Sequence, residues 1–305
     1  MTRLIRSLLA GSTLVCCTLA HADMIADWNT IALNAVESSG AHPANALQAV
    51  AGIHVAMFEA MNFIERRYVP RFLMRPVAPI SASSEVAAAA AAHHVLARLY
   101  PDQSAALDAA LDRSLAQIPD GSDKASGMTT GKALGGNIYA VWAWDRAAPA
   151  SPAGPTDSAF DPLLWNLIAA KLIEGRGLAP IEAARVHALV SFAVSEVYSA
   201  SARNGRAARA DPTCVPCAAG VATLSILESA LAPSRIPPAA MGSLRKLDEG
   251  TILRALIIYN ERSAGHAERR LGQRSGMRAL AHYRPAQPDQ PLTACLSCTA
   301  RTQQS

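Results

Sequence analysis

The sequence predicts an all-α fold, and three observations carry this prediction. Apolar residues recur three and four positions apart, which places them on one face of an α-helix. An alanine-rich run covers residues 86–92, and alanine is the strongest helix former. No stretch alternates apolar and polar residues between turn signals, as half-buried strands do.

The helical elements can be justified in order along the first half of the chain. A first apolar stripe predicts a core-facing helix at Leu47, Val50, His54, Met57, Met61 and Ile64. The alanine-rich run extends this pattern to a second helix that reaches Leu99. A third stripe consists of Leu107, Leu111, Leu115 and Ile118. Gly131, Gly135 and Gly136 precede Ile138 and Trp142, and the missing side chains at these glycines would admit a crossing helix.

The second half continues with helices. Pro180 suits the first turn of a helix, and Glu182 complements the positive end of the helix dipole. Apolar residues then repeat through Phe192, and a short element is expected around Leu224 to Leu231. A polar, arginine-rich loop is expected over 203–217. Two prolines at 237 and 238 then precede a last long helix, which is expected over 244–259.

The chain begins with a segment typical of an export signal. Arg3 and Arg6 precede an apolar run, and Ala20-His21-Ala22 has the small-x-small pattern of a signal-peptidase site. We therefore expect cleavage after Ala22 and a periplasmic or secreted protein. The apolar run is shorter than the roughly 20 residues that a membrane span needs, and no later stretch is expected to be a span.

Residues 23–282 are expected to form a single helical domain, with halves at 23–146 and 160–282 separated by a stretch rich in proline, alanine and serine. A proline-containing tail covers 283–305. Removal of Arg3 and Arg6 lowers the formal charge from +4 to +2. This near-neutral balance carries no electrostatic signal for nucleic acid.

Four cysteines remain after the predicted cleavage, in two Cys-x-x-Cys pairs: Cys214, Cys217, Cys295 and Cys298. Such pairs can bind zinc, act as redox-active thiols or form disulfides. Zinc ribbons separate their pairs by roughly 15 to 20 residues, a much shorter interval than the one in this chain. Oxidising conditions outside the cytoplasm favour disulfides. We therefore expect disulfides and no metal site.

Several segments resemble the bacterial vanadium-dependent haloperoxidases, which share a fold with type 2 phosphatidic acid phosphatases. They are Asp27-Trp28-Asn29, the run from Ala51 to Asn62, Trp165-Asn166-Leu167-Ile168-Ala169, and Arg176 to Arg185. The resemblance implies a helical bundle of the haloperoxidase and acid phosphatase type. It also implies an oxyanion site, holding vanadate or phosphate, built from a Lys, an Arg-Pro, a Pro-Ser-Gly-His motif and an Arg followed six residues later by a His.

This sequence departs from the family's site motifs. After Tyr198 it offers Arg203, Arg206 and Arg209 as anion-binding candidates, with no Lys and no Arg-Pro. Ala219 stands where the resemblance places the proton-transferring His, and a methyl group cannot transfer a proton. Arg262 and His266 are the remaining catalytic candidates, four residues apart where the family has six. On one unbroken helix they would share a face.

The sequence therefore favours a divergent member of this superfamily that has lost or rebuilt its oxyanion site and acts as a binding or accessory protein, with no cofactor expected. An active haloperoxidase or phosphatase with a rearranged Arg/His pocket, using vanadate or phosphate, is one alternative. A cysteine-based metal or redox module is another. These hypotheses are consistent with a small oxyanion or another small molecule as the ligand, and the sequence indicates no protein partner.

The other polar candidates are expected to be structural. His54 falls on the first apolar stripe and is predicted to be a hydrogen-bonded core histidine, and His187 is predicted to be structural as well. Asp27, Glu37 and Glu59 are separate acids that are expected to be solvated or to cap helices.

Overall fold

The all-α prediction is confirmed. A computed structural model describes residues 23–41, 43–70, 81–142, 163–174, 176–207 and 266–282, with short helical pieces between 219 and 230. These residues form eight packed α-helices and one short 3-10 helix, and they contain no strand. The predicted helix over 244–259 and the tail over 283–305 lie outside the described residues.

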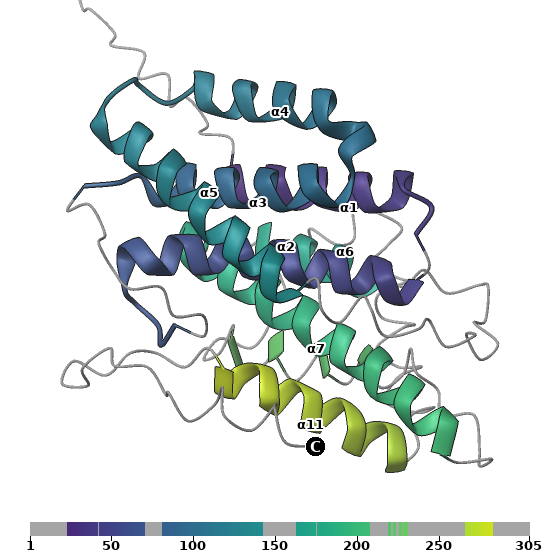
Figure 1. Cartoon of the computed structure of the whole chain (residues 1–305). Helices are drawn as coiled ribbons and strands as arrows, with labels where there is room; N and C mark the ends of the chain where they lie inside the picture. Colours follow the sequence, from purple (N-terminus) through teal and green to yellow (C-terminus); the bar gives the residue numbers. More distant parts are fainter. Residues whose placement is uncertain are drawn as a thin grey trace, which may run out of the picture.

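The helices stack in layers (Figure 1). α2 lies in the middle, with α3, α5 and α4 on one side and α7 and α11 on the other. In chain order the bounds are α1 Met24–Ser38, α2 Pro43–Glu65, α3 Ser84–Leu99, η1 Pro101–Gln103, α4 Ser104–Ala116, α5 Ser122–Trp142, α6 Leu164–Glu174, α7 Pro180–Ala207 and α11 His266–His282.

The central helix is α2, and it is buried more completely than its sequence stripe suggests. It packs against α7, α3, α5 and α1, so residues 50–62 are buried on every face. Glu59 is therefore only 2 % exposed, and the expectation that this acid is solvated or capping was wrong. Asn45–Glu65 is the one described segment long and apolar enough to cross a membrane, and 83 % of its apolar 18-residue window is buried among the other helices. That burial fits a core helix.

Close packing of α3 on α5 confirms the role predicted for two of the α5 glycines. A Cβ on Gly131 would lie 2.7 Å from the Cβ of Ala90, and closer still to the carbonyl oxygen of Ala87. A Cβ on Gly135 would lie 2.8 Å from the carbonyl oxygen of Ala91. The glycines on α5 and the alanines on α3 thus let the two backbones touch.

Local sequence signals explain where several helices begin and end. Asp23 caps α1 by accepting hydrogen bonds from the backbone of Ile25 and Ala26, at 3.0 and 3.3 Å. Gly40 follows α1 with a φ of 61°, the left-handed conformation that glycine adopts without strain. After α2, the amide of Asn62 accepts from the Tyr68 N–H at 2.8 Å and donates to the Tyr68 carbonyl at 3.0 Å.

One boundary differs from the sequence prediction. α7 begins at Pro180 as expected but continues to Ala207, so the loop predicted to start at Arg203 was wrong for residues 203–207. Three of these five residues, Arg203, Arg206 and Ala207, are good helix formers, and the segment extends the preceding helix although Asn204 and Gly205 are poor ones. The remainder of that predicted loop, up to residue 217, lies outside the described residues.

Candidate functional site

The described residues bring together none of the predicted site side chains. Arg203 and Arg206 lie in the last turns of α7, and His266 is the first residue of α11. The side chains of these three residues lie outside what the structure describes, as do Arg209 and Arg262 altogether. The four cysteines, Cys214, Cys217, Cys295 and Cys298, are also outside the described residues, so the disulfides stay a prediction.

A polar cluster lies instead in the core where α2, α6 and α7 meet. It consists of His54, Asn166, His187 and Ser191, each no more than 3 % exposed. The Ser191 hydroxyl lies 2.5 Å from Nδ1 of His54, 2.7 Å from Oδ1 of Asn166 and 2.7 Å from the His187 carbonyl oxygen. Because the hydroxyl has one proton and two of its neighbours only accept, His54 Nδ1–H is the donor in the first of these bonds. The predicted hydrogen-bonded core histidine is confirmed.

Burial keeps both histidines of this cluster neutral. It lowers the pKa of His187 to about 4. The pKa of His54 is held well below its ordinary value, first by burial and then by the neighbouring His187, whose carbonyl oxygen partly offsets the effect. The two rings lie 5.1 Å apart, centroid to centroid. The cluster as a whole links α2, α6 and α7 through the Ser191 hydroxyl, and its four side chains are buried.

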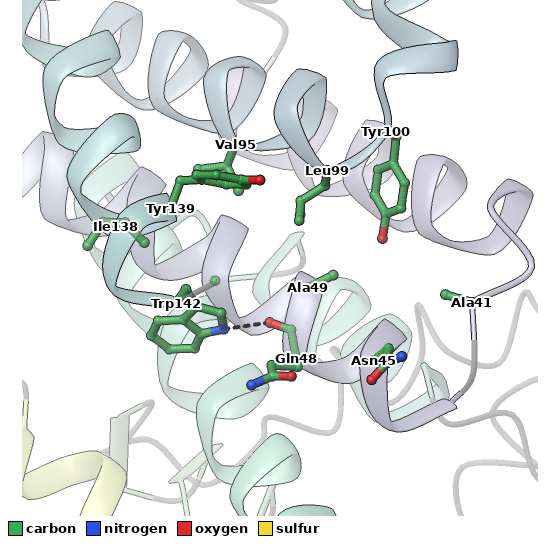
Figure 2. Close-up of a pocket in the computed structure, with 11 residues that line it drawn as sticks. Ala41, Asn45, Gln48, Ala49, Val95, Leu99, Tyr100, Ile138, Tyr139 and Trp142 are labelled. Atoms are coloured by element: carbon green, nitrogen blue, oxygen red, sulfur yellow. Dashed lines mark hydrogen bonds between the residues drawn. The ribbon is translucent and has the colours of Figure 1, made fainter. Parts of the chain in front are cut away.

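A groove that opens to solvent lies on the other side of α2, between α2, α3 and α5 (Figure 2). Its volume is about 180 Å³. The floor consists of the buried residues Gly52, Val95 and Ile138. The walls are half-buried or exposed: Ala41, Asn45, Gln48, Ala49, Leu99, Tyr100, Tyr139 and Trp142.

The two ends of the groove differ in chemistry. Figure 2 shows Tyr139 and Trp142 from α5 at one end, Tyr100 at the other, and the amides of Asn45 and Gln48 below them on α2. No Asp, Glu, Lys, Arg or His is among the lining residues. The groove therefore offers aromatic surface and uncharged hydrogen-bonding groups, with no acid, base or cation at neutral pH.

The aromatic end is held in place by specific contacts. Trp142 donates from Nε1 to the backbone carbonyl of Gln48 at 2.9 Å. The indole also lies where a side chain on Gly52 would be, since a Cβ there would sit 3.0 Å from the ring. The guanidinium of Arg98 lies 5.4 Å from the centre of the Tyr139 ring, a cation–π contact. The groove is thus built by the packing of α2 against α5.

Sequence reasoning missed these groove residues. Two signals were present: Asn45 and Gln48 are polar positions three apart at the start of an otherwise apolar helix, and Tyr139 and Trp142 are three apart at the end of another. Neither signal says which helices meet.

Among the described residues, no group of three or more His, Cys, Asp or Glu side chains is placed to hold a metal ion. Comparison with known proteins gives no match of any kind: the chain matches no family model, no curated protein and no solved structure.

Proposed function

We propose that this protein is a non-catalytic binding protein that takes a small, uncharged organic molecule in the groove between α2, α3 and α5. One observation carries the proposal: an open groove of about 180 Å³ whose lining combines three aromatic side chains with two amides and includes no charged residue. Ligand sites in proteins have this composition, apolar and aromatic walls with a few polar groups that fix orientation.

The sequence argues against oxyanion turnover. Ala219 stands where the haloperoxidase family has its proton-transferring His, and the segment after Tyr198 has no Lys and no Arg-Pro. A methyl group cannot transfer a proton. We therefore propose that the chain is a divergent haloperoxidase-like protein without oxyanion turnover.

Oxyanion turnover is the second candidate, because Arg262 and His266 remain from the family's last motif. A bromination assay with vanadate and peroxide separates the two. We expect no more product than in buffer. Vanadate-dependent product that disappears in His266→Ala would establish the second candidate.

Export by cleavage after Ala22 is part of the proposal too, and N-terminal sequencing of the exported protein should then begin at Asp23.

The binding proposal is tested by filling the groove. Ala49 lies half-buried in its wall, so Ala49→Leu places an isobutyl group in the cavity. Ala109→Leu makes the same change on the exposed face of α4 and is the matched control. Phenol, indole, benzamide and cyclohexanol are titrated into each protein by NMR.

We expect at least one of these compounds to bind saturably, with affinity reduced at least about tenfold in Ala49→Leu and unchanged in Ala109→Leu. The proposal is wrong if none of the four binds the wild-type protein, or if Ala49→Leu binds as tightly as the wild type.

A further inference from the structure

Two amide side chains in the α2 wall of the groove have unused hydrogen-bonding capacity. Within the described residues, the side-chain amides of Asn45 and Gln48 have no hydrogen-bond partner, and Gln48 is half-buried. The two residues are three apart on α2 and so project from neighbouring positions of the same face. Each primary amide both donates and accepts. The α2 wall of the groove thus presents donors and acceptors side by side.

The volume of the groove suits a single ring. An engineered apolar cavity of about 150 Å³ in another protein holds one benzene molecule. At about 180 Å³ this groove has room for a ring of that size with one small substituent. The flanking Tyr139 and Trp142 rings offer flat apolar surfaces, which planar aromatic groups contact in offset-stacked or edge-to-face arrangements.

Charge narrows the ligand class further. No cation or carboxylate lines the groove, so a charged ligand would lose hydration there without gaining a partner of opposite charge. The guanidinium of Arg98 contacts one wall residue, Tyr139, by lying over its ring, but Arg98 does not line the groove.

From these observations, and on the premise that the groove binds a small neutral molecule as proposed above, we propose that its ligand is an uncharged planar ring carrying an amide or lactam edge. The ring lies against Tyr139 and Trp142, and the amide or lactam edge pairs with Asn45 and Gln48. An edge with a donor and an acceptor on neighbouring atoms matches the donor and acceptor of a primary amide side by side, whereas an alcohol offers both functions from a single oxygen and a carboxylate only accepts.

Four probes separate the parts of this inference when they are titrated into the intact protein. Benzamide has the ring and the amide, ethylbenzene has the ring alone, cyclohexanecarboxamide has the amide on a non-planar ring, and benzoate has the ring with a charge. We expect benzamide to bind most tightly, by about three- to tenfold over ethylbenzene, the range for one net hydrogen bond, and more tightly than cyclohexanecarboxamide and benzoate as well.

Side-chain replacement gives a second readout. Gln48→Leu removes the amide but keeps the backbone carbonyl that anchors Trp142. In this variant and in Asn45→Leu, we expect the preference for benzamide over ethylbenzene to fall by about three- to tenfold. Asn137→Leu removes an exposed amide from α5 outside the groove and should leave that preference unchanged.

The outcomes are distinguishable. If ethylbenzene, cyclohexanecarboxamide and benzamide all bind equally, the groove is a binding site for neutral molecules but the amide-edge inference is wrong. Tightest binding of benzoate would also overturn it, in favour of an anionic ligand beside Arg98. If none of these four probes binds, this inference is wrong, and the proposed function fails with it unless phenol, indole or cyclohexanol binds.

Discussion

Replacing Gly131 by alanine should loosen the contact between α3 and α5 and destabilise the protein. The new methyl carbon would lie 2.7 Å from the Cβ of Ala90 and 2.9 Å from the Cα of Ala87, and the Ala87 carbonyl oxygen would be closer still. These neighbours are backbone or Cβ atoms, which cannot move aside by a change of rotamer. The helices themselves must separate.

The magnitude follows from two opposing terms. Overpacking a tight core contact costs about 1 to 3 kcal/mol, and a backbone collision belongs near the upper end. Alanine in place of glycine inside a helix returns about 0.5 to 1 kcal/mol. The net loss is about 2 kcal/mol, which lowers the melting temperature of a domain of this size by roughly 4 to 8 °C.

The control is Gly136→Ala, five residues beyond Gly131 on the same helix. Its nearest neighbour would be Nε2 of His94 at 3.4 Å, an ordinary contact, so this variant should gain up to about 1 kcal/mol. Urea unfolding followed by circular dichroism at 222 nm measures both variants. A Gly131→Ala protein as stable as Gly136→Ala would refute the close packing of α3 on α5.

Three other predictions concern the core and the covalent structure. The pKa of His187 is about 4 in the folded protein, below the 6.5 of an ordinary histidine, so the unfolded chain binds a proton there first as the pH falls. The free energy of unfolding should be full above pH 6.5 and fall by about 3 kcal/mol as the pH drops to 4. Urea unfolding should find this fall reduced in His187→Gln. Asn62→Ala should cost about 2 to 3 kcal/mol by the same measurement, because it leaves the buried N–H and carbonyl of Tyr68 without partners, and an unchanged free energy of unfolding would contradict this. Non-reducing peptide mapping of the exported protein should find two disulfides, at least one of them joining a cysteine of the pair 214/217 to one of the pair 295/298; four free thiols, or one bound zinc, would contradict this.

The helices could be predicted from the sequence because their signals are local. Apolar spacing placed the helix through His54, and the alanine-rich run placed α3. The glycines of α5 even identified a close crossing, since a glycine ridge has few other uses in a helix interior. Tertiary packing changed the details. Glu59 looked exposed because the sequence stripe marks only one buried face, while α2 is covered on all sides.

The groove could not be predicted because it belongs to no single helix. Gln48 and Trp142 are 94 residues apart, and they meet only because α2 crosses α5 where Gly52 leaves space for the indole. The polar core cluster was foreseen in part. The position of His54 predicted a hydrogen-bonded core histidine, but its partner Ser191 is 137 residues away on α7. Sequence spacing indicates which face of a helix is buried, not which helix covers it.

The central claim, that the groove between α2, α3 and α5 is a binding site, is tested most directly at the Trp142 indole. A ¹H–¹⁵N spectrum of protein labelled at tryptophan reports each indole N–H, and Trp142→Phe assigns the signal. Trp28 and Trp165 are at most 1 % exposed and serve as internal references. We predict that benzamide shifts the Trp142 signal saturably and leaves those of Trp28 and Trp165 in place. A Trp142 signal that does not move, at benzamide concentrations up to its solubility, would contradict the account.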